Sequence, residues 1–240
     1  MSAAVPDTAM LLAAGLGKRM RPLTGAMPKP LIPVAGKPMI DYILDAAAAA
    51  GISRVVANVH YLAGQIEAHA KKRQAPEIII SDERAKLLDS GGGVLKALPL
   101  IARDTFFVLN GDSFWIDGPR NNLVRLAEAW NPGTMDILLM LSPVTSAAGW
   151  ANRGDFALDQ LGRLRRAGKR EMTPFAYAGA GIWKASLFAG RPEIFSLNLL
   201  FDEAEAKGQL HGLRLDGSWL HVGTPDAIAE AEAVLERSAR

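Results

Sequence analysis

Residues 11–40 read LLAAGLGKRMRPLTGAMPKPLIPVAGKPMI, and they indicate a buried strand that runs into a glycine-rich turn. The apolar run stops at Gly15, and Gly17 and Arg19 follow it closely. A second cation, Lys29, stands between prolines, which limit its backbone conformations. Glycines let backbone N–H groups approach an anion, and fixed cations neutralise its charge. The stretch therefore predicts a turn that binds a polyphosphate.

Two familiar phosphate-binding motifs do not explain this turn. A dinucleotide-binding turn needs glycine or alanine three residues after Gly17, where this chain has Met20. A P-loop needs serine or threonine after its lysine, but Arg19 follows Lys18, and Leu12 stands where the first glycine belongs. Another kind of phosphate site is required.

The order of short elements carries a family resemblance. L-x-A-G-x-G-x-R, P-L-T, P-K-P-L and K-P-M follow one another along this stretch, and they resemble the signature of the sugar-1-phosphate nucleotidyltransferases. The resemblance implies transfer of a nucleotidyl group from a nucleoside triphosphate to a sugar 1-phosphate, with release of pyrophosphate. It implies a nucleotide-binding loop that comprises Ala13, Ala14, Gly15 and Gly17. It also implies that Arg19 grips the pyrophosphate portion and that Lys29 lies at the α-phosphate.

Apolar runs alternate with helical segments in the first part of the chain. We expect strands at residues 8–13, 54–58, 77–81, 105–109 and 135–141. We expect helices at residues 39–50, 62–72, 92–98 and 122–130. This alternation predicts an α/β fold: a Rossmann-like, doubly wound, mixed but mostly parallel sheet with helices on both faces.

The pattern changes after about residue 142. Residues 155–158 and 164–167 flank a polar turn and predict a small antiparallel hairpin, which the resemblance sets over the sugar site. Further strands are expected at 176–183, 209–215 and 219–222, with helices at 196–207 and 225–237. We therefore expect one domain over 1–240, with a nucleotide-binding half at 1–142 and a sugar-binding half at 143–240.

A carboxylate follows one of the expected strands. Asn110-Gly111-Asp112 comes directly after the apolar run 106–109. A carboxylate just past a buried parallel strand lies at the ligand edge of the sheet, where a divalent cation bridges phosphate oxygens. The resemblance makes Asp112 a metal ligand, and Arg19, Lys29 and Asp112 together the catalytic residues.

The segment LLDSGGG at residues 87–93 precedes an expected helix and resembles the base-binding turn of the family. We therefore expect Gly91 and Gly92 to bind the nucleobase, with Asp82 just upstream at a strand end. An ordinary glycine-rich helix entry is the alternative interpretation.

The expected metal site departs from the family pattern at one position. The family element W-x-D-V-G-T occurs here with His221 in place of aspartate. Imidazole is a poor ligand for Mg²⁺ but suits Mn²⁺. Three interpretations stay open: His221 binds a softer ion, it acts through a water, or Asp112 holds the ion with phosphates and waters alone. The expected cofactor is Mg²⁺, with Mn²⁺ as the alternative.

The sugar side departs as well. Many family members have E-K-P, whose lysine grips the sugar phosphate, and then N-A-G; here methionine follows Glu171, and Tyr177 replaces the asparagine. Arg153 and Lys169 are the candidates to compensate for the missing lysine, and their spacing does not decide between them. P-K-P-L-x-P-V-A-G, the triple glycine, G-D-F and W-x-x-V-G-T resemble the N-acetylmuramate 1-phosphate uridylyltransferases of cell-wall recycling. By positional match, the sugar pocket would contain Asn110, Asn152 and Gly179.

Two alternatives remain for the function. Mannose-1-phosphate guanylyltransferases, which make GDP-mannose, share the N-terminal signature but usually keep the E-K-P lysine. A non-catalytic nucleotide-sugar sensor would account for the altered metal position. The presence of Arg19, Lys29 and Asp112 argues against a sensor, which has little need of a metal carboxylate beside a phosphate-binding lysine.

Composition limits the possible partners. The 240 residues carry a net charge of +2, with 49% hydrophobic and 22% charged residues, so we expect small-molecule substrates and no nucleic acid. There is no cysteine, and the four histidines are scattered, which argues against a zinc cluster. Apolar runs are too short to span a membrane, and the N-terminus lacks the basic start of a signal peptide. We expect a cytoplasmic monomer or small homo-oligomer.

Overall fold

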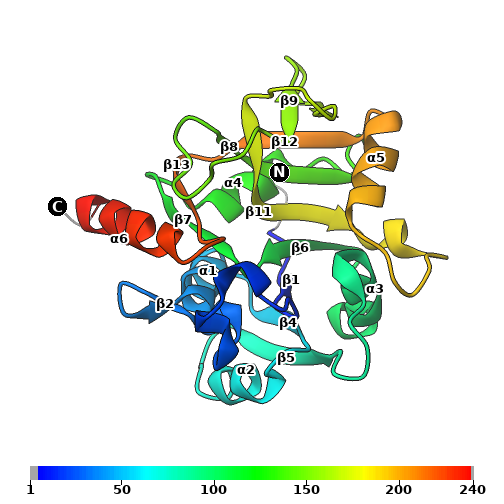
Figure 1. Ribbon diagram of the computed structural model, residues 1–240. Helices are drawn as coiled ribbons and strands as arrows, with labels where there is room; N and C mark the ends of the chain where they lie inside the picture. Colours follow the sequence, from blue (N-terminus) through cyan, green and yellow to red (C-terminus); the bar gives the residue numbers. More distant parts are fainter. Residues whose placement is uncertain (1–4, 239–240) are drawn as a thin grey trace.

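The computed structural model describes residues 5–238, and a mixed nine-stranded sheet forms its centre (Figure 1). The domain expected over 1–240 includes four residues at the start and two at the end that lie outside the described residues. Within residues 5–238, no helix combines the length and apolar character needed to cross a bilayer.

The sheet joins a parallel part to an antiparallel part. Its main strands lie in the order β12 (Leu210–Arg214), β8 (Ile137–Pro143), β11 (Phe175–Lys184), β6 (Thr105–Asn110), β1 (Thr8–Leu12), β4 (Arg54–Val59) and β5 (Glu77–Asp82). The last four are parallel neighbours, whereas β11 runs antiparallel to both β6 and β8. The prediction of a mixed, mostly parallel α/β sheet is confirmed.

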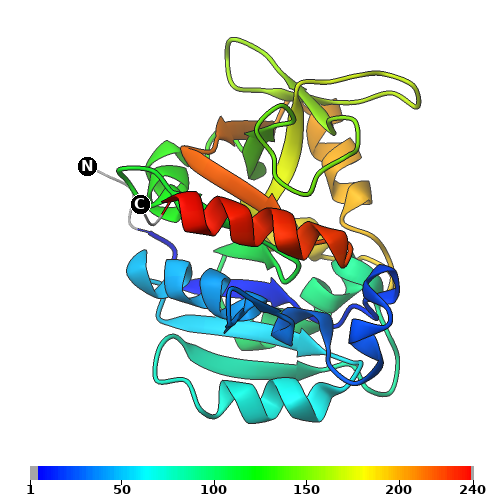
Figure 2. The same ribbon diagram turned by 60° about the vertical axis from the view of Figure 1, so that its left-hand side comes forward.

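The sequence of β1 is a continuous apolar run because both faces of this strand are buried. Leu11 belongs to the core beneath α1 (Met39–Ala49), and Met10 belongs to the core on the other face, beneath α3 (Asp89–Ile101). Both faces are covered, so neither alternate position can be polar. The α1 face also carries α2 (Ala63–Ala70), α4 (Asn122–Ala129) and α6 (Asp226–Ser238), and the α3 face carries α5 (Asn198–Ala206). Figure 2 shows α6 lying across the front of the α1 face.

The predicted hairpin is present. β9 (Phe156–Leu158) and β10 (Leu164–Arg166) pair antiparallel, which confirms that prediction. Phe156 also pairs with Phe175 at the start of β11, so the hairpin extends the main sheet instead of forming a separate unit.

Some short elements are not predicted by the sequence. β2 (Pro33–Val34) pairs with β3 (Lys37–Pro38), and β7 (Ser113–Asp117) pairs antiparallel with β13 (Gly217–His221). Within residues 5–238, 3₁₀ helices lie at Lys18–Met20, Leu23–Gly25, Lys29–Leu31 and Ala185–Phe188. The β7–β13 ribbon matters most, because it fastens the end of the chain beside the carboxyl end of β6.

Candidate active site

A cavity of ≈ 630 Å³ opens where β1, β4 and β6 end. Parallel strands direct ligands to this edge, because the turns that follow them face the same space. Its lining includes the expected nucleotide-binding residues Ala13, Ala14, Gly15 and Gly17 and the expected catalytic residues Arg19, Lys29 and Asp112. Segments that are distant in the sequence thus share one cavity.

The glycine-rich turn needs glycine at position 17. Gly17 has a φ of +58°, and a Cβ there would lie 2.8 Å from Cγ2 of Thr24. The Thr24 hydroxyl donates to the carbonyl oxygen of Gly17 at 2.9 Å, so the turn is held against the segment that leads to Lys29. At Gly15, by contrast, no atom lies within 4 Å of a Cβ position. The backbone at Gly15 is therefore accessible to a ligand.

A buried polar chain fixes the start of the turn, and sequence reasoning missed it. The N–H of Ala13 donates to Oδ1 of Asn58 at 2.8 Å, and Nδ2 of Asn58 donates to Oε1 of Glu83 at 2.7 Å. Glu83 is fully buried, and its other oxygen accepts from the N–H of Leu88 at 3.2 Å. These donors compensate the desolvation of the carboxylate. Asn58, a polar residue near the end of an otherwise buried strand, is the signal that could have revealed the chain.

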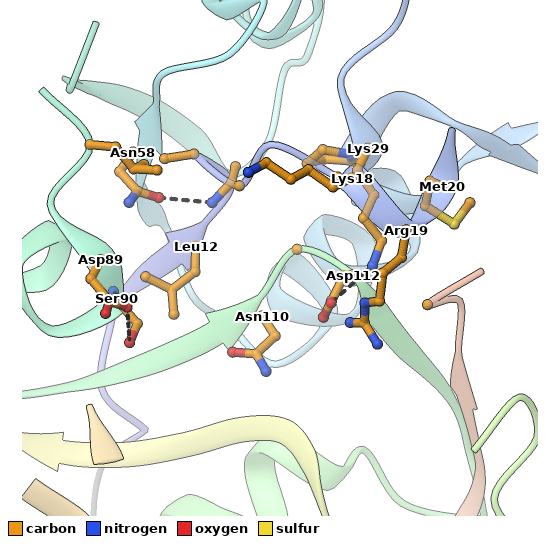
Figure 3. Close-up of a pocket in the computed structure, with 18 of the residues that line it drawn as sticks. Leu12, Lys18, Arg19, Met20, Lys29, Asn58, Asp89, Ser90, Asn110 and Asp112 are labelled. Carbon is orange, nitrogen blue, oxygen red and sulfur yellow. Dashed lines mark hydrogen bonds and ion pairs between the residues drawn. The ribbon is translucent and has the colours of Figure 1, made fainter. Parts of the chain in front are cut away.

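Three charged side chains meet at one wall of the cavity (Figure 3). Nζ of Lys29 donates to Oδ2 of Asp112 at 3.0 Å, and the Lys29 side chain is only 10% exposed. Arg19 is exposed to the cavity and is directed toward the same carboxylate. The structure thus brings the three expected catalytic residues together, and their roles remain predictions.

The carboxyl group of Asp112 is held in its charged form. Burial alone would raise the pKa of Asp112. The cations around it, led by Lys29 and joined by Arg19, outweigh burial and hold this pKa below its usual value. A permanent negative charge therefore lies among the cations of the cavity.

His221 lies beside this wall without lining the cavity, with its Nε2 close to Gly223, which does line it. β13 pairs with β7 so that His221 lies opposite Ser113, and the N–H of Val222 donates to the carbonyl oxygen of Asp112 at 3.3 Å. The His221 ring packs edge-on against Trp150, with ring centroids 5.1 Å apart. Burial lowers the pKa of His221, and the opposing charge of Asp112 does not restore it. The imidazole is therefore neutral, which is the form that binds a metal ion.

These groups fit one divalent cation. Lys29 occupies one oxygen of Asp112 and leaves the other available, and His221 adds a nitrogen donor of the kind that binds Mn²⁺ more readily than Mg²⁺. Within residues 5–238, no group of three or more His, Asp or Glu side chains could hold a metal ion alone. An ion here would take its remaining ligands from phosphate oxygens and water, as Mg²⁺ commonly does.

The expected base-binding segment contributes its first residues to the cavity. Leu87, Asp89 and Ser90 line it, and Figure 3 shows Asp89 and Ser90 across the cavity from Asp112. α3 begins at Asp89 and not at residue 92 as predicted. Asp89 has a φ of +63°, so the chain turns sharply as it enters the helix.

The other residues expected to bind the nucleotide lie outside this lining. Gly91 and Gly92 are buried, and both donate their N–H groups to the carbonyl oxygen of Phe195, at 2.9 and 3.1 Å. A Cβ at Gly91 would lie 2.4 Å from the Phe195 ring, so glycine is needed for this packing. Asp82 points to Arg84, whose Nε donates to both of its oxygens at 3.0 Å.

The amino-acid sequence of this chain is similar to those of known proteins. Residues 8–151 match the nucleotidyl transferase family. The chain belongs to that family. It is 43% identical to the N-acetylmuramate alpha-1-phosphate uridylyltransferase of Caulobacter vibrioides, over 96% of this chain and 97% of the relative. It is 33% identical to the protein of the same name from Neisseria meningitidis serogroup B, over 94% of this chain and 97% of that protein.

Solved structures share the fold of this nucleotidyl transferase. The UTP-bound UGPase of Acinetobacter baumannii superposes with a TM-score of 0.79 at 20% identity, covering 96% of this chain and 92% of that chain. A putative glucose-1-phosphate thymidylyltransferase of Bacillus anthracis gives a TM-score of 0.78 at 18% identity, covering 94% of each chain. At these identities the likeness concerns the fold alone.

A sugar-1-phosphate nucleotidyltransferase must bring two anions together. Repulsion and misorientation are the main barriers, so positioning and charge neutralisation supply most of the catalysis. The cavity offers what this requires: accessible backbone at the turn, the cations Arg19 and Lys29, with Lys18 also in the lining, and the ionised carboxylate of Asp112.

The expected sugar-binding residues lie in two adjoining places. Asn110 lines the cavity already described, and a Cβ at Gly179, whose φ is +81°, would lie 3.2 Å from the Cβ of Asn110. Asn152 instead lines a second cavity of ≈ 500 Å³, together with Tyr177. Tyr177 and Gly179 both lie on β11, and Gly179 packs beside Asn110, so β11 places the two cavities next to each other. Burial raises the pKa of Tyr177, and the charge of Asp112 adds to that effect.

Proposed function

We propose that this nucleotidyl transferase transfers the uridylyl group of UTP to N-acetylmuramate 1-phosphate, giving UDP-N-acetylmuramate and pyrophosphate for peptidoglycan recycling. The observation that carries the proposal is the 43% identity to the Caulobacter uridylyltransferase over 96% of the chain. That likeness includes the second half, where the sugar is expected to bind.

The proposed reaction is a direct displacement. An oxygen of the sugar phosphate attacks the α-phosphorus of UTP and forms a new P–O bond. The bond from that phosphorus to the bridging α–β oxygen breaks, and pyrophosphate leaves with its electron pair. No covalent enzyme intermediate is needed.

Each group at the first cavity has a proposed task. The turn at 13–17 donates backbone N–H groups to the triphosphate, and Asn58 holds the start of that turn. Arg19 neutralises the leaving pyrophosphate. Lys29, fixed by its bond to Asp112, stabilises charge at the α-phosphate. Leu87 and Ser90 are proposed to border the base.

We propose that the activity depends on a divalent cation, Mg²⁺ or alternatively Mn²⁺, held by Asp112 and His221. When bound, the ion supplies neutralisation of the phosphate charges. The residues present support this proposal, because the N–H of Val222, next to His221, donates to the carbonyl oxygen of Asp112, which brings the imidazole close to the ionised carboxylate.

The broader organisation is part of the same proposal. We infer a nucleotide-binding half at 1–142 and a sugar-binding half at 143–240, and a monomer or small homo-oligomer that acts in the cytoplasm. Support for the division comes from the lining of the two cavities, since the second is lined by residues after 149.

A substrate matrix tests the function. Pyrophosphate release is measured with UTP, GTP, CTP or dTTP against the 1-phosphates of N-acetylmuramate, N-acetylglucosamine, glucose and mannose, with Mg²⁺, Mn²⁺ or a chelator. We expect the highest kcat/KM with UTP and N-acetylmuramate 1-phosphate and no turnover with the chelator. Preference for GTP and mannose 1-phosphate would replace the proposal by a guanylyltransferase, and no turnover with any pair would favour a sensor.

A further inference from the structure

The second cavity carries charges that the transfer chemistry does not use. Most of its lining belongs to the loops on either side of the β9–β10 hairpin. Figure 1 shows this hairpin at the upper end of the molecule. Its lining includes Trp150, Asn152, Arg153, Asp155, Lys169 and Tyr177.

Some charged residues of this cavity are neutralised within the fold. Arg166 forms an ion pair with Asp202 and also donates to Oδ1 of Asn198 at 3.1 Å. Glu171 forms an ion pair with Arg165, which holds the pKa of Glu171 at about 2. These groups have partners and do not require a ligand.

Arg153 and Lys169 differ from them. In the part of the chain that the structure describes, no carboxylate lies within ion-pair distance of either side chain. Nη1 of Arg153 donates to the carbonyl oxygen of Lys169 at 2.7 Å, which joins the two loops, and both residues are exposed and line the cavity. Two neighbouring cations without an ion-pair partner favour an anion from solution, and a guanidinium matches the planar shape of a carboxylate.

The interior of the cavity is polar and aromatic. Oδ2 of Asp155 accepts from the N–H of Tyr177 at 2.9 Å. The Tyr177 hydroxyl is buried and has no hydrogen-bond partner among residues 5–238. The rings of Trp150 and Phe201 complete the lining. Apolar rings with a few convergent polar groups are typical of a small-molecule site, so the interior suits an uncharged ring and the mouth suits an anion.

We propose that Arg153 and Lys169 bind the carboxylate of the lactyl group of N-acetylmuramate 1-phosphate, while its sugar ring lies inward beside Asp155 and Tyr177. This inference rests on the proposed function. N-acetylmuramate differs from N-acetylglucosamine only by the lactyl ether, whose carboxylate is ionised at neutral pH. The phosphate of the same sugar faces the first cavity, which adjoins the second along β11, where Gly179 packs beside Asn110 and Tyr177 lines the second cavity. The two cations therefore select an acidic sugar.

Two substrates that differ only in the lactyl group test the proposal. kcat/KM is measured with UTP and either N-acetylmuramate or N-acetylglucosamine 1-phosphate for the full chain and its variants. Arg153→Ala and Lys169→Ala should each lower kcat/KM for the N-acetylmuramate substrate about tenfold, mainly through a higher KM. Turnover of the other substrate should stay within about twofold, since it has no carboxylate to lose.

A matched control separates this effect from a general loss of charge. Arg170→Ala removes an equal charge from the same loop but outside the cavity lining, and it should change neither substrate. Arg153→Lys keeps the charge and should recover part of the loss. Where turnover of N-acetylglucosamine 1-phosphate is too slow, calorimetric binding of the two UDP-sugars gives the same comparison.

The outcomes decide between the two proposals. Equal losses on both substrates would assign Arg153 and Lys169 a structural role and overturn the inference, and unchanged kinetics would overturn it too. In both cases the proposed function stands, provided the wild-type chain prefers N-acetylmuramate 1-phosphate. A wild-type preference for an uncharged sugar would overturn the proposed function and this inference together.

Discussion

Each of the two cavities contains a partly buried carboxyl group, and the pKa values of these groups move in opposite directions. Cations hold the pKa of Asp112 below its usual value although burial opposes them. Burial raises the pKa of Asp155, and the hydrogen bond from Tyr177 and the charge of Arg166 do not offset it. The first cavity is thus organised around a permanent charge, and the interior of the second around hydrogen bonds to uncharged groups.

The two cavities also differ in what builds them. The first lies at the ends of buried parallel strands and is braced by the Asn58–Glu83 chain. The second lies between loops that are joined at Arg153. Rigid strand ends suit chemistry that a whole family shares, and loops suit the choice of sugar, since loops vary without disturbing the core.

The largest effect is expected where the charge of the first cavity is removed. Asp112→Asn should lower kcat about a thousandfold, or about 4 kcal/mol in the activation barrier, because the carboxylate charge is lost while its shape is kept. Pyrophosphate release measures the rate, and circular dichroism checks the fold. Asp104→Asn, an exposed change at the opposite end of β6, is the control. A rate within threefold of wild type would remove Asp112 from the reaction.

A smaller loss of activity is expected when Arg19, a cation that lines the same cavity, is replaced. Arg19→Ala should lower kcat/KM about a hundredfold, with both kcat and the KM for UTP affected, because its charge acts in the ground and transition states. Arg21→Ala removes an exposed arginine nearby that does not line the cavity, and should leave kinetics unchanged. If both variants lowered kcat/KM by the same factor, the general positive charge of this region, and not the position of Arg19, would explain the loss.

The packing of α3 against Phe195, next to the first cavity, should not tolerate a larger side chain. Gly91→Ala would force a Cβ to within 2.4 Å of the Phe195 ring, so it should lower the free energy of unfolding by about 2 kcal/mol. Gly64→Ala, in α2 with nothing within 4 Å of the new Cβ, should raise it by about 0.5 kcal/mol. Urea unfolding measures both. Equal effects would mean that α3 adjusts freely.

The metal preference depends on His221. His221→Asp should raise the ratio of Mg²⁺-supported to Mn²⁺-supported kcat about fivefold, because carboxylate oxygen suits Mg²⁺ better than imidazole does. Both rates are measured at saturating substrates and a series of metal concentrations. An unchanged ratio would show that position 221 does not contact the ion.

The smallest effect concerns the carboxyl group of the second cavity. Because folding raises the pKa of Asp155 above its ordinary value of 3.8, its contribution to stability is complete below pH 3.8 and is lost as the pH rises through the folded-state pKa. Asp155→Asn should remove this part of the pH dependence, so the variant gains stability relative to wild type as the pH rises. Thermal melting between pH 3.5 and pH 7 measures the difference, and parallel curves would contradict it.

Much of the fold could be predicted because buried parallel strands form continuous apolar runs. The strand at residues 8–13 and the turn after it are contiguous in the chain, so Gly17, Arg19 and Lys29 could be singled out together. The pairing of β7 with β13 could not be predicted, since its register depends on two segments that are distant in sequence. The proximity of His221 to Asp112 was therefore expected only from the family resemblance.

The limits at the site have equally physical causes. A run of glycines before a helix is compatible with contact to a nucleobase and also with close packing inside the protein. Only the position of Phe195 in the structure shows that Gly91 packs against a ring. The Asn58–Glu83 bond joins two strand ends whose spacing in sequence carries no periodic signal. The Arg153–Lys169 contact depends on loop conformation, which hydrophobic patterning does not specify.

The β7–β13 ribbon makes this region of the fold depend on a late segment of the chain. A ribosome extrudes the glycine-rich turn and Asp112 long before His221, and domains begin to fold as they emerge. The nascent chain therefore exposes an unpaired β7 edge until the last strand arrives to cover it. Trp219 and Leu220 of β13 are buried in the hydrophobic core, so a polypeptide truncated by a premature stop codon before β13 would lack part of that core as well as His221.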